Sequence, residues 1–75
     1  MIVDLAVEQE ADGTWDERVI VMAQKNLLVE LGRGATVTAR YETTPRLALE
    51  VDQRALRRLR ASPLVLGIHL DENER

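Results

Sequence analysis

The spacing of hydrophobic residues changes repeatedly along this 75-residue chain, and the order of these spacings is the strongest constraint on its fold. Apolar and polar residues alternate over 2–8, 35–43 and 47–51, which is typical of strands with one buried face. Residues 64–70 are almost wholly apolar and predict a fourth strand. Because this last strand is the most apolar, we expect it at the centre of the sheet.

A helix is expected between the first two strands. Thr14-Trp15-Asp16-Glu17 fits a capping box, in which Thr14 and Glu17 each accept a hydrogen bond from the other's backbone amide. Apolar residues then recur every four positions, and Gly32 follows as a C-cap. The apolar stripe comprises Trp15, Val19, Ala23, Leu27 and Leu31 with Ile20 and Leu28, which leaves Asp16, Arg18, Gln24, Lys25 and Glu30 for solvent. The β-branched run 19–21 also permits a strand over 18–23, but the capping box and the recurrence favour the helix.

Thr44-Pro45 makes a short break between the second and third strands, so these two strands are expected to pair as an antiparallel hairpin. Asp52 then fits the N-cap of a second helix over 53–61, which Ser62-Pro63 ends. The inner side of this helix consists of Ala55, Leu56 and Leu59, and its arginines, Arg54, Arg57, Arg58 and Arg60, are expected in solvent.

The predicted order is therefore β-α-β-β-α-β. Two right-handed crossovers around a hairpin give a ferredoxin-like α+β fold, a four-stranded antiparallel sheet with both helices on one face. The other face is left free to meet a partner. We expect it to display small or polar residues, namely Asp4, Ala6, Thr36, Thr38, Arg40, Glu42, Ala48 and Glu50.

Composition narrows the functions that such a domain can have. The chain has no cysteine and one histidine, so we expect no disulfide, metal or cofactor. Its net charge of −3 argues against nucleic acid as the main partner, and no apolar run is long enough to span a membrane. Ser62 and His69 stand at opposite ends of one strand, too far apart for a hydrogen bond. Because no catalytic constellation is found, an enzyme is not expected. The chain is either cytosolic or part of a secreted protein without its signal.

In the second half of the chain, the predicted helix with alanine and leucine positions ends in Ser62-Pro63-Leu64-Val65, and an apolar strand and acidic residues follow. This pattern resembles the proregion of subtilisin-like serine proteases. In that family a helix with small and leucine positions ends in an Asp/Ser-Pro-x-Val turn, and an apolar strand and acidic residues follow. The residues that match in type and spacing are Ala55, Leu59, Pro63, Val65, Ile68 and Asp71. In element order the resemblance covers the whole chain.

This resemblance implies an intramolecular chaperone and inhibitor of a subtilisin-like protease, secreted as part of its precursor. Residues 1–71 would form the domain, and the tail 72–75 would enter the substrate cleft as an extended strand. The implied protease-binding residues are Thr36, Thr38, Arg40, Glu50, His69, Asp71, Glu72, Asn73, Glu74 and Arg75. His69 stands where the family commonly has a second acid. The alternative is a small ferredoxin-like regulatory or oligomerisation module.

Overall fold

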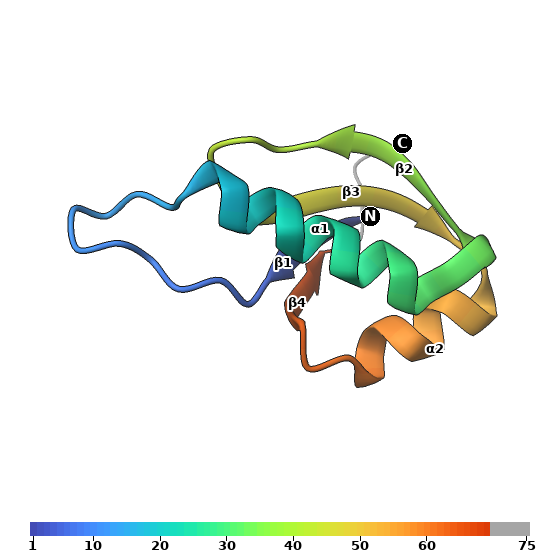
Figure 1. Ribbon diagram of the computed structural model, residues 1–75. Helices are drawn as coiled ribbons and strands as arrows, with labels where there is room; N and C mark the ends of the chain where they lie inside the picture. Colours follow the sequence, from blue (N-terminus) through green and yellow to red (C-terminus); the bar gives the residue numbers. More distant parts are fainter. Residues whose placement is uncertain (70–75) are drawn as a thin grey trace.

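A computed structural model describes residues 1–69 of the chain (Figure 1). Its elements are β1 (Ile2–Leu5), α1 (Glu17–Leu31), the 3-10 turn η1 (Gly32–Gly34), β2 (Ala35–Arg40), β3 (Arg46–Val51), α2 (Gln53–Ala61) and β4 (Val65–His69). This order confirms the predicted β-α-β-β-α-β arrangement. Neither helix in this part of the chain is long and apolar enough to cross a membrane.

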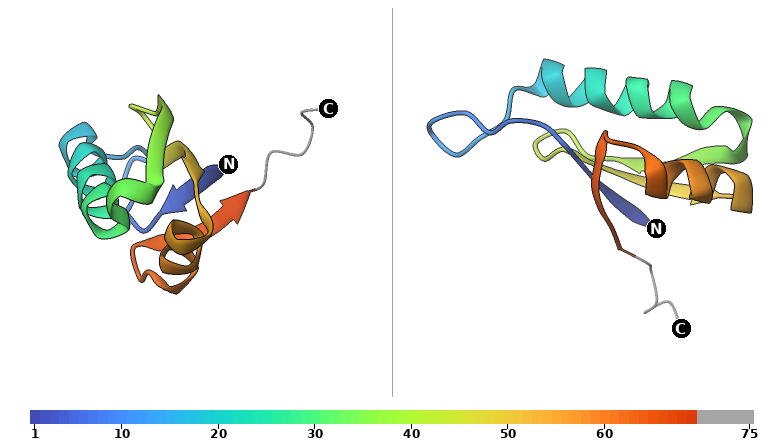
Figure 2. Two further views of the ribbon diagram at one scale, coloured as in Figure 1. Left: turned by 90° about the vertical axis from the view of Figure 1, so that its right-hand side faces the viewer. Right: turned by 90° about the horizontal axis from the view of Figure 1, so that it is seen from below.

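All strand pairs are antiparallel, and the strands lie in the order β2-β3-β1-β4. Both helices pack on the same side of this sheet, as Figures 1 and 2 show, so the chain has the expected ferredoxin-like fold. The prediction that the last strand is central is wrong, because β4 is an edge strand. The edge position of β4 follows from the topology. Since β3 already pairs with one side of β1, the second crossover places β4 on the other side of β1.

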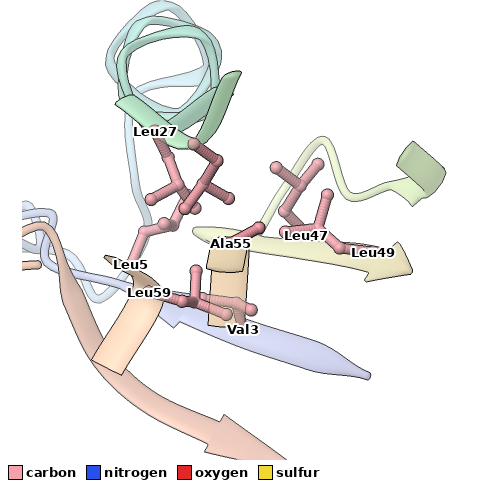
Figure 3. Packing of buried hydrophobic residues seen from close by; sticks show 8 residues of the cluster. Val3, Leu5, Leu27, Leu47, Leu49, Ala55 and Leu59 are labelled. Atoms are coloured by element: carbon pink, nitrogen blue, oxygen red, sulfur yellow. The ribbon is translucent and has the colours of Figure 1, made fainter. Parts of the chain in front are cut away.

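The core lies between the sheet and the two helices. Its buried side chains come from β1, α1, β3 and α2, and they point toward one another in Figure 3. They are Val3, Leu5, Leu27, Leu31, Leu47, Leu49, Ala55 and Leu59. Aliphatic side chains therefore fill the whole core cluster, as the absence of phenylalanine requires.

The segment before α1 forms a turn of its own. Asp12 Oδ1 accepts hydrogen bonds from the amide and the hydroxyl of Thr14, at 3.1 and 2.7 Å, and these bonds lower the pKa of Asp12. Gly13 takes a φ of 89°, which suits glycine. The predicted capping box at Thr14 is therefore wrong. Asp16 is the N-cap instead, and its carboxylate accepts from the amide of Arg18 at 2.9 Å.

The face of α1 that meets the core also differs from the predicted stripe. Its buried residues are Ile20, Gln24, Leu27 and Leu31. A strict four-residue spacing drifts by about 40° per step around a helix of 3.6 residues per turn, so it cannot follow one face over four turns. Val19, placed in the stripe, is accordingly 47% exposed.

Gln24 was expected in solvent, and this is wrong. Its side chain is 1% exposed, and its Nε2 donates to the carbonyl oxygens of Tyr41 and Arg46, both at 2.9 Å. These two carbonyls flank the connection between β2 and β3. The buried amide therefore fastens the hairpin to α1 and satisfies backbone groups that would otherwise lack donors.

The second helix begins and ends where the sequence predicts, over Gln53–Ala61. Asp52 is its N-cap, and Asp52 Oδ1 accepts from the amide of Ala55 at 2.8 Å. The amide of Asp52 in turn donates to the carbonyl of Gly34 at 2.9 Å. A side chain on Gly34 would collide with the Asp52 carboxylate, so the close approach of η1 to α2 requires glycine here.

Candidate functional site

The candidate site is the face of the sheet that neither helix covers, which we call the docking face (Figure 2). The strand register places its members side by side. Ile2 pairs with Ala48 of β3 and with His69 of β4, and Asp4 pairs with Arg46 and Gly67. Together with the paired residues of β2, the docking face consists of Ile2, Asp4, Thr36, Ala39, Arg46, Ala48, Glu50, Gly67 and His69.

A bulge in β2 changes which residues of that strand reach the docking face. Thr36 pairs with Glu50, as expected for this face. The register then shifts between Val37 and Ala39, so Thr38 is the additional residue without a partner on β3. Beyond the bulge, each side chain of β2 therefore lies on the face opposite to the one predicted from strict alternation.

The prediction that Arg40 lies on the docking face is therefore wrong. Arg40 pairs with Leu47, whose side chain is buried in the core on the helix side. Ala39, which was expected to face the core, pairs with Ala48 on the docking face instead. Arg40 remains exposed because β2 is an edge strand. Ala6 and Glu42, two further expected members, lie beyond the ends of β1 and β2.

A row of charged side chains crosses the docking face at β3, β1 and β4. Arg46 Nε donates to Asp4 Oδ1 at 2.8 Å, and His69 Nε2 lies 2.7 Å from Asp4 Oδ2. Partial burial alone would raise the pKa of Asp4, but the hydrogen bonds from His69 and Arg46 and their positive charge outweigh it, so the pKa lies below 3.8. Asp4 is therefore ionised at neutral pH, and His69 Nε2 donates to it.

A hollow of about 350 Å³ opens next to this row, where β1 leaves the sheet. Its walls are the Asp4–Arg46 ion pair and several apolar side chains, including half-buried Trp15 and Leu66, which is 73% exposed. We call it the Trp15 hollow. Its full lining is Asp4, Leu5, Val7, Trp15, Thr44, Pro45, Arg46 and Leu66. A volume in this range with apolar walls and few polar groups suits one apolar side chain or a small ligand.

The remaining predicted site residues divide into two groups. Thr36 and Glu50 lie on the docking face, as expected, and the strand register places His69 there as well. Asp71, Glu72, Asn73, Glu74 and Arg75 lie outside the described residues. Asp4 was expected on this face, but neither Asp4 nor Arg46 was predicted as a site residue. The sequence does show an acid, Asp4, and a base, Arg46, at outward positions of two strands with alternating polarity. Only the pairing of β1 with β3 brings these two side chains together.

No metal centre is found within residues 1–69, because no three His, Asp or Glu side chains converge there. Ser62 is buried, and its Oγ accepts from the amide of Leu64 at 3.1 Å, which closes the turn before β4. His69 instead contacts Asp4, so serine and histidine are not brought together. In the described part of the chain, Ser62 and His69 therefore do not form a nucleophile–base pair.

Comparison with models of protein families, with curated proteins and with solved structures found no significant match.

Proposed function

We propose that this chain is a docking and inhibitory domain like the proregions of subtilisin-like serine proteases, and that it serves such a protease as intramolecular chaperone and inhibitor. The observation that carries the proposal is the docking face, a sheet surface that neither helix covers (Figure 2). Sheet surfaces without a covering layer are available for association with another molecule. The resemblance in sequence, centred on α2 and β4, supplies the class of partner.

The side chains of the docking face suit a protein partner. Ile2, Ala39 and Ala48 lie in one row across the strands, and the two alanines are short enough to let a partner's surface approach the backbone. Beside them the Arg46–Asp4 ion pair supplies fixed charges, and His69 contacts the same carboxylate. Such charges set the orientation of a complex and its rate of formation more than its affinity.

The end of β4 lies at the border of this face. His69 is its last residue, and its imidazole contacts Asp4 on the docking face. His69 is the last residue that the structure describes, so the described chain ends beside the docking face. We infer that the tail 72–75 runs from there into the substrate cleft of the protease, where main-chain hydrogen bonds hold it.

The Trp15 hollow adds an anchor point next to the same face. Asp4 and Arg46 belong to both, so a partner on the face reaches the hollow without a gap. Leu66 and Trp15 offer apolar surface there, and burial of one apolar side chain contributes about 1.5–3 kcal/mol. We infer that one apolar side chain of the protease enters this hollow.

A titration of the full chain against purified subtilisin-type proteases tests the proposal. We expect inhibition that competes with a peptide substrate, with a dissociation constant in the micromolar range or lower. Ala48→Glu places a charge at the middle of the docking face and is expected to weaken inhibition about tenfold or more. Val29→Glu is the matched control, because it adds the same charge on α1 at a residue that is 82% exposed.

A second variant separates docking from inhibition. Deletion of residues 72–75 is expected to abolish inhibition while the shortened chain still binds the protease in a direct binding assay. Circular dichroism checks that each variant folds. Absence of inhibition by the intact chain at high micromolar concentration contradicts the proposal. A stable dimer in sedimentation together with no protease binding favours the regulatory or oligomerisation module instead.

A further inference from the structure

A second hollow is lined by residues from the end of α1, η1 and the first turns of α2. These segments lie at the opposite end of the molecule from the segment that joins β1 to α1 (Figure 1). The volume of this hollow is about 180 Å³, and three arginine side chains contribute to its wall. We call it the arginine hollow. It is lined by Leu31, Arg33, Gly34, Asp52, Arg54, Ala55 and Arg58.

Within the part of the chain that the structure describes, carboxylates do not balance the charges around this hollow. Within residues 1–69, the two ion pairs that form both involve Asp4, so Arg33, Arg54 and Arg58 have no carboxylate within 4.0 Å. The one acid in the wall, Asp52, uses its Oδ1 to accept from the amide of Ala55. Three arginines thus line one hollow together with one aspartate.

General basicity does not explain this concentration of arginine. The chain carries 13 acidic and 10 basic residues, a net charge of −3, yet three of its bases surround one small hollow. Like charges held close together repel, and a bound anion converts that repulsion into attraction. A purely solvated arginine face needs no hollow and no convergence of residues from two elements.

The shape of the wall indicates the kind of anion. Arg54 and Arg58 stand one turn apart on the same face of α2, and Arg33 approaches from η1. Guanidinium groups bind planar pairs of oxygens, and oxyanions such as phosphate accept several such forks at once. Gly34 contributes no side chain to the wall, because the Asp52 carboxylate already occupies the place where its Cβ would lie.

We propose that the arginine hollow binds a phosphate-type oxyanion, with Arg33, Arg54 and Arg58 as its ligands. This site is independent of the proposed protease docking, since the docking face lies on the other side of the sheet from α2. A phosphoryl group bound here would bridge η1 to α2. It would therefore stabilise the folded chain by mass action.

Arg58 also has a structural contact that the test must separate from anion binding. Its Nη1 lies 3.8 Å from the place where a Gly32 side chain would begin, at the C-terminal end of α1. A cation at that position stabilises the helix by itself. Arg54 has no such contact with Gly32, so loss of binding in an Arg54 variant reports on the anion alone.

The experiment titrates the full chain with inorganic phosphate and with pyrophosphate, against sodium chloride of equal ionic strength. Calorimetry and backbone amide shifts report binding. We expect saturable binding of both phosphates, with shifts concentrated at Arg33, Gly34 and the first turns of α2. Arg54→Gln and Arg58→Gln are expected to weaken binding about tenfold each, the effect of one lost charge-assisted hydrogen-bonding group.

Arg57→Gln and Arg60→Gln are the controls, because each removes the same charge from the same helix outside the hollow. We expect them to change the dissociation constant less than about twofold, as screened surface charges do. The proposal is overturned if chloride produces the same shifts, or if phosphate binding does not saturate. It is equally overturned if all four glutamine variants weaken binding alike, since diffuse attraction would then account for it.

Discussion

The two hollows of this protein contain the same residue type in opposite electrostatic situations. In the Trp15 hollow, Arg46 donates to the Asp4 carboxylate at 2.8 Å, and His69 contacts the other oxygen of that carboxylate. In the arginine hollow, three arginines face one acid that already caps α2. The first hollow is the larger, about 350 against 180 Å³, and has the more apolar wall.

This difference shows that an arginine acquires its role from what stands next to it. Where a neighbouring strand supplies a carboxylate, the arginine becomes part of a fixed charged row on a binding surface. Where no carboxylate is supplied, its donors remain available to a ligand. The comparison therefore predicts that the Trp15 end binds protein surface and the arginine end binds anions.

The largest expected effect tests whether the two ends belong to one folding unit. Leu59 on α2 is fully buried in the shared core, and Leu59→Ala should reduce the free energy of unfolding by about 2–5 kcal/mol. Trp15 fluorescence reports one end, and circular dichroism reports the helices. Both signals should shift to the same lower midpoint in urea. Separate midpoints would mean that the two ends unfold independently.

The next effect concerns what holds the Trp15 end together. Gln24→Leu removes both donors to the Tyr41 and Arg46 carbonyls, so the free energy of unfolding should fall by about 1–3 kcal/mol. Lys25→Leu, at an exposed neighbouring position, is the control and should change stability little. Urea denaturation measures both variants. Equal stability of Gln24→Leu and the wild type would show that these bonds contribute nothing.

A smaller effect separates the role of Asp52 as the N-cap of α2 from the effect of its negative charge on the arginine hollow. Asp52→Ala removes the N-cap of α2 and should cost about 1 kcal/mol, while Asp52→Asn keeps an acceptor and should cost less. Both variants remove the only carboxylate from the arginine hollow, so both should bind phosphate more tightly than the wild type. Thermal melting with and without phosphate measures the two effects. Weaker phosphate binding by Asp52→Asn would contradict the electrostatic comparison.

The smallest effect is expected from the charged row. The pKa of Asp4 in the folded chain lies below its ordinary value of 3.8, so its contribution to stability is present above that value and lost as the pH falls through the folded pKa. Asp4→Asn should therefore cost up to about 1 kcal/mol at neutral pH. The difference from the wild type should shrink as the pH falls from about 5 through 3.8 and below. Urea midpoints across this range measure it, and a constant difference would refute the assignment.

Most of the fold could be predicted from local pattern, and the errors have identifiable causes. The period of two found the strands, and Asp52 and Gly32 marked helix ends as expected because capping depends on neighbours in sequence. Thr14 is not the cap because its hydroxyl donates to Asp12, while Asp16 accepts from the first turn of α1. The sequence alone did not show which of these neighbouring polar residues would cap the helix. The central position assigned to β4 failed because strand order follows from topology and not from composition.

The candidate site was less accessible to the same reasoning. The side of β2 was predicted correctly for Thr36 but not for Arg40, because one bulge reverses every later residue. The partnership of Asp4 with Arg46 and His69 joins residues 42 and 65 positions apart in the chain. Such pairs depend on strand register, for which a single sequence carries only indirect information.

The sequence by itself determined the number and order of helices and strands, the aliphatic core and the exclusion of a cysteine-based site, because each follows from residue type and local spacing. Tertiary structure alone decided which arginine received a carboxylate, which glutamine was buried and which three arginines came to share a hollow. The physical reason is that electrostatic and hydrogen-bonding roles depend on distances across the fold, and those distances exist only after the chain has packed.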